Sequence, residues 1–460
     1  MGYYLLIDFG STFTKLTAVD LDKGEIVATA SHFTTVATDI RDGYRNALIA
    51  LYNQLGREIK FTRTIGCSSA SGGLKMAAIG LVQELTVEAA RRVCLGAGAK
   101  VDLVFAHHLT KRDLQAITDG KIDIILLAGG ADGGNTESAI FNATRLGEAK
   151  IKIPIVFAGN KSCQDEIEAI FQRYGMNGHI CENVMPKINV LNIKSAREKI
   201  REIFLKQIIE AKGIKKIEAE IDQVILPTPE AVLQAAELLS RGYLDEKGLG
   251  DIVLTDIGGA TTDMYSICNA TNRSDVIFHG LDEPFAKRTV EGDLGMRYSA
   301  PGIIKSLTKE EIIKLNQAKN IDIEREVDYR YRHVDMVPTN PHDYHVDQLL
   351  AEMCVYKAMQ RHVGRIEEVL TPMGIVYNQF GKDLSAANYV IGTGGVLIKS
   401  HDPMGILHQT TNIKRIPGEL RPLNPGYLLD EDYILAAMGL LSQTEPLLAL
   451  RLMKRHLKPL

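Results

Sequence analysis

Short apolar runs alternate with amphipathic stretches along the chain, beginning at the N-terminus. The runs at 3–8, 14–21 and 25–32 have the length and residue types of strands. Residues 41–55 then repeat apolar positions with the period of an amphipathic helix. We expect a further strand pair at 60–82, around a turn of small residues. Strands that lead into helices in this way predict an α/β fold.

From about 97 to 185, short buried strands alternate regularly with helices. Because successive strands in this order need a crossover helix, the pattern predicts a parallel sheet. We interpret 97–185 as an inserted Rossmann-like subdomain. Glycine-containing turns at 131–135 and 160–162 follow two of its strands, where such sheets bind ligands or partners. Glycines also simply end strands, and the sequence favours neither reading.

Helices dominate the remaining pattern, apart from a strand-rich unit that starts at Asp251 and a strand that ends at Gly392. The stretch 270–345 is mixed and polar and predicts no clear element. The further helices are expected at 195–212, 229–241, 346–371 and 431–458.

We expect four parts of the chain, which together form two lobes and an insertion. They are a first lobe at 1–96, the insertion at 97–185, the rest of the first lobe with connecting helices at 186–250, and a second lobe at 251–460.

The composition is that of an ordinary folded protein. Of 460 residues 45% are apolar and 24% charged, which excludes a disordered or collagen-like chain. The formal net charge of −4 gives no basic excess that would favour nucleic acid or an anionic membrane. The six cysteines form no CxxC pair, so a reducing cytoplasm fits. We expect neither a secretory leader nor a transmembrane span.

Residues 5–20 combine a buried strand with a turn of small residues. The strand leads to Asp8, and Gly10, Ser11 and Thr12 allow a hairpin to present backbone N–H groups and hydroxyls. Such a nest binds phosphate oxygens, and the carboxylate can hold hydrated magnesium. By itself, a strand that ends in an Asp-Gly turn is also typical of an ordinary hairpin.

The segment 251–267 repeats this arrangement. An apolar strand leads to Asp256, and Asp263 opens the next strand. Two such hairpins facing each other across a cleft would clamp a triphosphate from both sides. Asp8 and Asp256 would then lie close together, which a bound cation makes tolerable, so both are candidate metal ligands. The small residues of the second turn are Gly258, Gly259 and Thr261.

A third segment, 388–400, runs from a strand into Gly392-Thr393-Gly394-Gly395. Glycines here would let the backbone approach a flat ligand such as an adenine base. Taken alone, this pattern is more typical of a strand–helix turn.

In this order and spacing, the three segments resemble the phosphate-1, phosphate-2 and adenosine motifs of the actin/heat-shock-70/sugar-kinase superfamily. The resemblance implies a two-lobed actin-like ATPase with ribonuclease H-like lobes, ATP or ADP, and Mg²⁺. It also implies that Asp8 and Asp256 orient magnesium and its waters and that Asp263 helps to position the attacking water. The residues expected at the nucleotide are Gly10, Ser11, Thr12, Lys15, Gly258, Gly259, Thr261, Glu291, Gly392, Gly394 and Gly395.

A closer similarity covers most of the chain and is to the MutL (GlmL) family of glutamate mutase accessory proteins. It is carried by GCSSASGGLKMAAIGL, LLAGGADGGN, VFAGNKSC, LTDIGGATTD, RTVEGDLGMR and IGTGGVL. The resemblance implies an ATP-dependent reactivating factor or chaperone of an adenosylcobalamin-dependent mutase. By the same resemblance, the partners are glutamate mutase subunits, and the protein promotes release of damaged cobalamin.

The chain departs from the heat-shock branch in its first connecting segment. That branch carries a Glu just before Pro-Thr, whereas here Leu226 precedes Pro227-Thr228. Glu230 lies four residues away, and the sequence does not decide whether it replaces the missing carboxylate. The departure suggests slow hydrolysis, as in a nucleotide switch.

Each of the other candidate functional residues allows both a functional and a structural interpretation. Glu291, in the loop 288–299, contacts nucleotide or water, or belongs to a solvated turn. The His-containing clusters at 107–108 and 342–347 fit surface polar residues better than a metal site. Cys163 and Cys181 fit small core residues better than a redox cluster.

Two alternative functions stay open. A small-molecule kinase of the same superfamily would use Asp256 or Glu291 as its base. A non-hydrolysing, nucleotide-bound scaffold would fit the missing Glu before Pro227.

Overall fold

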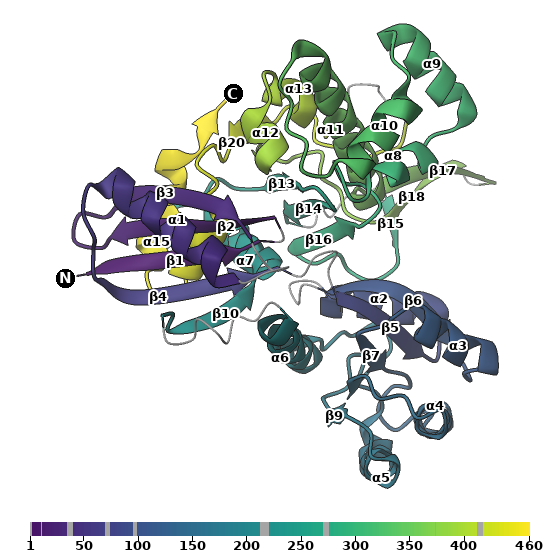
Figure 1. Ribbon diagram of the computed structural model, residues 1–460. Helices are drawn as coiled ribbons and strands as arrows, with labels where there is room; N and C mark the ends of the chain where they lie inside the picture. Colours follow the sequence, from purple (N-terminus) through teal and green to yellow (C-terminus); the bar gives the residue numbers. More distant parts are fainter. Residues whose placement is uncertain are drawn as a thin grey trace. The chain divides into compact units, whose positions relative to one another are not determined.

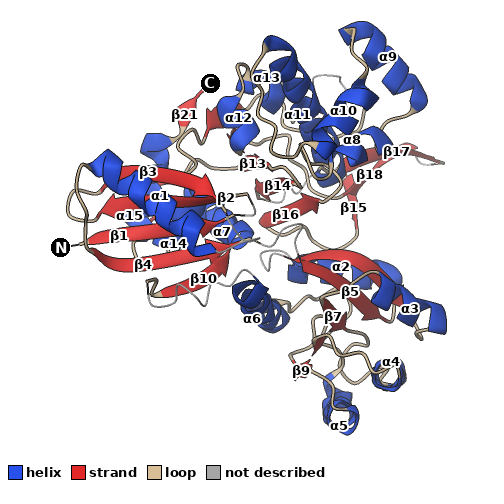
Figure 2. Cartoon of the chain, in the orientation of Figure 1, coloured by secondary structure: helices blue, strands red, loops and turns tan. Residues whose placement is uncertain are grey.

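The computed structural model describes residues 2–10, 12–34, 40–69, 74–94, 99–211, 220–269, 276–372, 374–411 and 417–460. By internal contacts the chain divides into two compact units. The N-unit comprises Gly2–Leu16 and Ala30–Glu230, and the C-unit comprises Thr17–Thr29 and Ala231–Leu460. Both units mix helices and strands (Figures 1 and 2), so the predicted α/β class is confirmed.

One five-stranded sheet carries the first phosphate motif, and its strand order is β10-β4-β1-β2-β3. Its strands are β1 (Tyr3–Phe9), β2 (Phe13–Asp20), β3 (Glu25–Phe33), β4 (Phe61–Ser68) and β10 (Gln223–Pro227), and α1 (Ile40–Leu55) follows β3. β4 runs parallel to both β1 and β10. Leu5, Leu6 and Ile7 are all buried, because the centre of the sheet is covered on both faces.

The second sheet of the N-unit is parallel throughout and has the order β6-β5-β7-β8-β9. Its strands are β5 (Leu74–Gly80), β6 (Ala99–Ala106), β7 (Ile124–Leu127), β8 (Ile155–Phe157) and β9 (Gly178–Ile180). In chain order this is 2-1-3-4-5, the flavodoxin-like arrangement. The sheet includes β5, which precedes residue 97.

Helices connect the strands of this second sheet. α3 (Lys111–Asp119), α4 (Glu137–Glu148) and α5 (Gln164–Tyr174), with the short 3₁₀ helix η1 (Lys161–Cys163), contribute to one apolar core. α2 (Gln83–Cys94) and α6 (Lys194–Ala211) pack against each other.

The expected strand pair at 60–82 is wrong. β4 and β5 both exist, but β4 pairs with β1 and β10, whereas β5 pairs with β6 and β7. Both strands end in buried runs that are apolar or small on both faces, which is typical of interior parallel strands rather than of a hairpin.

The main sheet of the C-unit has the order β16-β14-β13-β19-β20-β21. Its strands are β13 (Ile252–Ile257), β14 (Thr262–Ile267), β16 (Ala286–Glu291), β19 (Tyr389–Thr393), β20 (Gly426–Leu429) and β21 (Lys458–Pro459). β13 pairs with β14 in antiparallel and with β19 in parallel orientation. The second phosphate motif and the glycine-rich third segment are therefore neighbours in one sheet.

Several helices complete the C-unit. α8 (Ala300–Lys305), α10 (Ile323–Arg332), α11 (Pro341–His362), α12 (Gly395–Lys399) and α13 (Pro403–His408) contribute to one apolar core of this unit, and α9 (Lys309–Lys319) packs against it. Two smaller sheets are present, β11 (Gly242–Tyr243) with β12 (Glu246–Lys247), and β15 (Val276–His279) with β17 (Arg365–Thr371) and β18 (Gly374–Phe380). α7 (Thr228–Arg241) begins in the N-unit and continues into the C-unit.

Two predicted helices have different bounds in the structure. The helix expected at 346–371 ends at His362, and 365–371 forms β17. Ile366, Val369 and Leu370 are spaced like one face of a helix, which explains the wrong extension. The expected helix at 431–458 is two helices, α14 (Leu435–Leu441) and α15 (Pro446–His456), because a proline starts the second.

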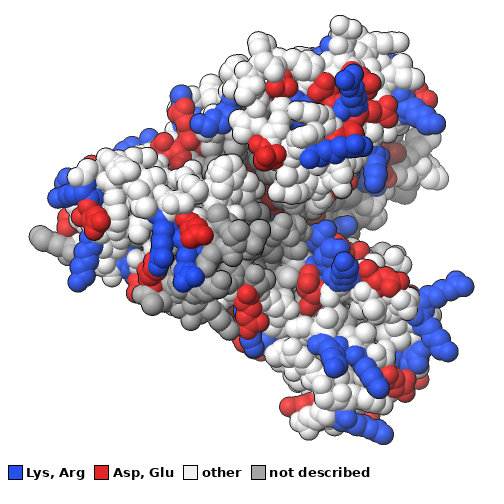
Figure 3. Space-filling view, viewed as in Figure 1, with Lys and Arg blue, Asp and Glu red and all other residues white. Residues whose placement is uncertain are grey.

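Within the described part of the chain, we find no helix with the length and apolarity needed to cross a membrane. On the face in Figure 3, acidic and basic side chains are interspersed, as the near-balanced composition leads us to expect.

A buried histidine predicts how the C-unit responds to pH. His362 is fully buried, and its ring nitrogens contact the hydroxyls of Thr289 at 2.8 Å and Ser266 at 2.9 Å. Burial lowers the pKa of His362 well below its usual value of 6.5, and the nearby cations of Lys287 and Lys382 lower it further. Below pH 6.5 the unfolded chain therefore binds a proton that the folded protein does not.

The free energy of unfolding should consequently fall as the pH decreases below that value, by up to ~1.4 kcal/mol per pH unit for this one group. His362→Gln does not ionise and should flatten the decline by about one proton. Urea unfolding followed by circular dichroism at pH 7.5 and 5.5 measures the difference, with the exposed His401→Gln as control. Equal pH dependence in wild type and His362→Gln would contradict the assignment.

Candidate functional site

The turn between β13 and β14 has the geometry of a backbone anion site. The carbonyl of Gly258 accepts a hydrogen bond from Met296 N (3.1 Å), and that of Gly259 accepts from Arg297 N (2.8 Å) and Tyr298 N (2.9 Å). In a trans peptide the N–H of the following residue points opposite to the carbonyl. The N–H groups of Gly259 and Ala260 are therefore both directed away from residues 296–298. Two adjacent donors that point the same way form a nest for an anion.

The segment 294–298 lies against the back of this turn. A Cβ atom on Gly295 would lie 2.5 Å from the carbonyl carbon of Ala260, so only glycine allows this approach. Within the turn, Gly258 N donates to Thr261 O at 2.9 Å. The back of the turn is thus closed by protein, and the donors face the other side.

The first hairpin repeats the hydrogen bond that spans this turn. Gly10 N donates to Phe13 O at 3.1 Å, which is the equivalent of the Gly258–Thr261 bond. A Cβ on Gly10 would lie 2.5 Å from Phe13 O. Thr34 secures the turn from one side, because its hydroxyl donates to Gly10 O (3.1 Å) and its N–H to Thr12 O (2.8 Å). Ser11, predicted at the nucleotide, lies outside the described residues.

Asp8 lies one residue before the end of β1 and is 6% exposed. Its Oδ1 accepts hydrogen bonds from the Thr228 hydroxyl at 2.6 Å and from Cys67 Sγ at 3.7 Å. Its Oδ2 lies 3.6 Å from Lys15 Nζ. Burial raises the pKa of Cys67, as does the charge of Asp8, so the thiol is neutral. The carboxylate is therefore oriented by three side chains from three strands or helices.

The sequence reasoning missed two of these contacts. Thr228 lies in the connecting segment that lacks the expected Glu, and Cys67 lies at the end of β4, where the run of small residues begins. Their only signal is their place in the sheet: Cys67 lies near the end of β4, which neighbours β1, and Thr228 follows β10, which neighbours β4. Leu226 is buried at 4% exposure, and Glu230, 6% exposed, lies 4.0 Å from Arg201 Nη1.

Asp263 lies opposite Asp256 in the β13–β14 register. Arg288 donates to Asp263 Oδ1 from Nε (2.9 Å) and Nη2 (2.6 Å), and the Thr261 hydroxyl donates to Oδ2 at 3.1 Å. In the first hairpin Lys15 occupies the corresponding place, seven residues after Asp8 as Asp263 is seven after Asp256. The role in positioning water stays a prediction.

The third segment adjoins Asp256, because Asp256 and Thr393 are paired in the β13–β19 register. Its three glycines have different surroundings. A Cβ on Gly392 would lie 2.8 Å from Leu407, so this glycine makes room for core packing. Gly394 has a φ of +109°, and a Cβ there would lie 2.5 Å from Ile257 O and 3.0 Å from Asp256 Oδ1. Gly395 has no atom within 4 Å of its would-be Cβ and borders open space.

This contrast gives a prediction about two neighbouring positions. Gly394→Ala should destabilise the protein by about 1–3 kcal/mol through backbone strain, and it should displace Asp256. Gly395→Ala should leave stability within about 0.5 kcal/mol but weaken binding of a ligand that lies against the backbone there. Thermal unfolding and adenosine titration of both variants test this. Equal unfolding temperatures for the two variants would contradict the prediction.

Glu291 ends β16 and is bound by Arg361. The Arg361 Nη1 lies 2.6 Å from Glu291 Oε2 and 2.7 Å from Asp293 Oδ1. Burial raises the pKa of Glu291, and the ion pair with Arg361 opposes this effect. Glu291 is thus held by a cation at the end of the strand that neighbours β14.

The remaining candidates have local roles. His342 Nε2 lies 2.9 Å from Glu326 Oε1, and the ring of His108 stacks on Phe141 at 4.1 Å. The thiols of Cys163 and Cys181 are buried, and each donates to a backbone carbonyl. Within the described ranges, no group of three His, Cys, Asp or Glu side chains is placed to hold a metal ion.

Comparison with known proteins gives a match over nearly the whole chain. A model of the family described as MutL protein matches residues 4–457. Protein MutL of Clostridium tetanomorphum is 48% identical over 459 residues, which is 99% of each chain.

Solved structures of sugar kinases are also similar, at low identity. Xylulose kinase from Lactobacillus acidophilus is 11% identical, with a TM-score of 0.36 over 100% of this chain and 93% of its own. Gluconate kinase from the same organism is 11% identical, with a TM-score of 0.35 over 99% and 92%.

Proposed function

The chain belongs to the MutL protein family, and on this premise we propose that it is an ATP-dependent accessory factor of glutamate mutase. It binds ATP with magnesium through its two phosphate hairpins and hydrolyses it slowly. Hydrolysis is coupled to a change in contact with the adenosylcobalamin-dependent mutase, which promotes release of damaged cobalamin.

The observation that carries the nucleotide proposal is the turn at Gly258–Thr261. The backbone N–H groups of residues 296–298 donate to the carbonyls of Gly258 and Gly259, so the turn presents N–H groups on its opposite side. Adjacent N–H donors in a nest favour phosphate over a neutral ligand. The first hairpin supports this reading, because it repeats the turn hydrogen bond two residues after an aspartate. Lys15 adds a cation beside that turn.

The residues present fit a magnesium ion. Asp8 and Asp256 offer carboxylate oxygens, which this hard cation prefers, and magnesium commonly keeps several waters while bound by one or two carboxylates. When bound, magnesium would supply charge neutralisation at the phosphates. Thr228 would hold the Asp8 carboxylate in one orientation, through its 2.6 Å hydrogen bond. Arg288 would hold Asp263 in the same way.

Slow hydrolysis follows from what surrounds the connecting segment. Leu226 offers no base at the place where the heat-shock branch has Glu, and it is buried. One oxygen of Asp263, the candidate for orienting water, is already bound by Arg288 at 2.6 Å and is therefore less available to an attacking water. A slowly cleaved nucleotide suits a switch whose two states bind a partner differently.

We propose that the mutase contacts the parallel sheet of the N-unit at its carboxyl edge. Three loops there are tied together, because Asn160 bonds both Gly133 N and Gly134 O, and Asn183 bonds Asp132. Beside them, the turn after β9 exposes Ile188 by 75% and Val190 by 51%. Exposed aliphatic side chains on a braced edge are suited to a protein partner.

The experiment measures ATP hydrolysis with and without glutamate mutase subunits, and their co-sedimentation with the protein. We expect slow turnover that the mutase stimulates, and Ile188→Asp should weaken association while leaving basal turnover unchanged. Phosphate transfer to a small-molecule acceptor, with no effect of the mutase, would favour a kinase instead. Nucleotide binding with no turnover under either condition would favour a scaffold.

A further inference from the structure

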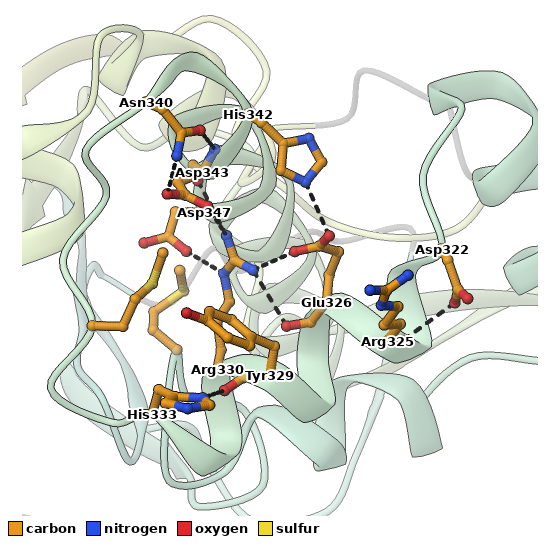
Figure 4. Close-up of polar contacts among 12 residues, drawn as sticks. Asp322, Arg325, Glu326, Tyr329, Arg330, His333, Asn340, His342, Asp343 and Asp347 are labelled. Atoms are coloured by element: carbon orange, nitrogen blue, oxygen red, sulfur yellow. Dashed lines mark hydrogen bonds and ion pairs between the residues drawn. The ribbon is translucent and has the colours of Figure 1, made fainter.

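A network of buried charged side chains lies in the C-unit, at residues that follow the second phosphate hairpin in the sequence. At its centre is Arg330 on α10, which is fully buried. Arg330 Nε donates to Asp347 Oδ1 at 2.7 Å, Nη1 donates to Glu326 Oε2 at 2.7 Å, and Nη2 donates to Asp343 O at 3.3 Å (Figure 4). The network thus joins α10 to the first two turns of α11.

Asp347 is shared between two arginines. Arg297 Nη2 lies 2.6 Å from Asp347 Oδ2, and Arg297 Nη1 lies 3.3 Å from Oδ1, the oxygen that Arg330 also binds. Arg297 further donates from Nε and Nη2 to Met336 O, at 3.3 and 3.1 Å. The side chains of Arg297 and Asp347 are 11% and 7% exposed. The guanidinium of Arg297 is therefore held on several sides, away from bulk water.

The backbone of the same arginine reaches the phosphate hairpin. Arg297 N donates to Gly259 O at 2.8 Å, and the next residue, Tyr298, donates to the same oxygen. This carbonyl sets the direction of the Ala260 N–H, since both belong to one planar peptide. A shift of Arg297 would therefore turn one of the two donors of the anion nest.

We propose that Asp347 and Arg297 are positioning residues for the second phosphate hairpin. Buried ion pairs add little net stability, because desolvation offsets their attraction, but a fully satisfied network admits one geometry. Here that geometry is imposed on Gly259 through Arg297. This inference rests on the proposed function, because ATP is the ligand whose phosphates we propose to lie at this hairpin.

A structural role alone would act differently. If the network only stabilised α10 against α11, its loss would lower the unfolding temperature and weaken all ligands in proportion to the folded fraction. A positioning role instead weakens the ligand that has phosphates and spares the one that lacks them. Comparison of ATP with adenosine therefore separates the two roles.

The test uses two variants and a matched control in the full-length protein. Arg297→Lys keeps the charge and the backbone N–H but cannot make the paired contacts with Asp347. Asp347→Asn removes the charge that both arginines share. The control is Asp328→Asn, the same substitution in an exposed ion pair of α10, where Arg332 Nε lies 3.0 Å from Asp328 Oδ2 and the side chains are 70% and 54% exposed.

Calorimetric titration should give an ATP dissociation constant about tenfold or more higher for Arg297→Lys, because small displacements of a binding group have large effects. Adenosine should bind within about twofold of wild type, and Asp328→Asn should match wild type for both ligands. Without nucleotide, amide exchange over residues 257–262 should be faster in Arg297→Lys, a measurement that also serves if Asp347→Asn does not fold.

The outcomes separate this inference from the proposed function. If wild type binds ATP and the folded Arg297→Lys binds it equally well, the positioning role is wrong and the proposed function stands. The positioning role is also wrong if ATP and adenosine weaken together. If wild type binds neither nucleotide nor nucleoside, the proposed function fails and this inference fails with it.

Discussion

Asp256→Ala is expected to lower ATP turnover at saturating magnesium by about 100-fold or more, because a carboxylate that orients the cation supplies several kcal/mol at the transition state. Asp256 lies one residue before the end of β13, between Thr393 of β19 and Asp263 of β14 in the strand register. This is the edge of the sheet where the donor nest at Gly259 begins. Removal of the carboxylate leaves the nest in place, so phosphate binding should weaken less than turnover.

Asp251→Ala is the matched control, since Asp251 lies just before the same strand and accepts hydrogen bonds from Asn269. It should retain turnover within about threefold of wild type. A phosphate-release assay at several magnesium concentrations distinguishes the two variants. Turnover by Asp256→Ala that equals that of Asp251→Ala would rule out Asp256 as a catalytic residue.

Arg288→Met is expected to reduce the free energy of unfolding by about 3–5 kcal/mol, the cost of leaving a buried charge without its partner. Arg288 and Asp263 side chains are 4% and 11% exposed, and the shortest distance between their charged atoms is 2.6 Å. Methionine fills a similar volume without a charge. The decrease in the free energy of unfolding therefore reports the unpaired Asp263 carboxylate rather than a cavity.

The double variant Asp263→Asn/Arg288→Met should recover at least part of this loss, because no net charge then stays buried. Urea unfolding followed by circular dichroism suits a chain without tryptophan. If the free energy of unfolding of Arg288→Met decreases by less than about 1 kcal/mol, water or another cation compensates the Asp263 charge. This result would contradict the burial of the ion pair.

The strand–turn–strand form of both hairpins was predictable from sequence, because each combines a buried strand, an aspartate and glycines in a short local pattern. The same holds for the parallel sheet of the N-unit apart from β5, because branched apolar runs alternate with helices from residue 97 onward. The pairing of Asp256 with Asp263 follows from the hairpin, whereas the approach of Gly394 to Ile257 was not predicted, because it depends on the pairing of β13 with the distant strand β19. The predicted features depend on contacts between residues that are close in sequence.

The features that the sequence did not predict depend on contacts between segments that are distant in the chain. Residues 294–298 contact the turn at Gly259 through backbone hydrogen bonds. Such bonds do not require particular side chains, so Gly295 is the one residue type that the contact specifies. The Arg297–Asp347–Arg330 network joins residues in and beyond a stretch without clear periodicity. The strand β17 was mistaken for helix because Ile366, Val369 and Leu370 fit helical spacing, and only tertiary contacts decide such a case.

We propose ATP with magnesium as the ligand of the two hairpins. The most direct measurement is calorimetric titration of ATP into the wild-type protein, once with magnesium and once with excess chelator. We predict a single binding event with a dissociation constant on the order of micromolar that weakens when magnesium is removed. Absence of any binding in the presence of magnesium would contradict the account.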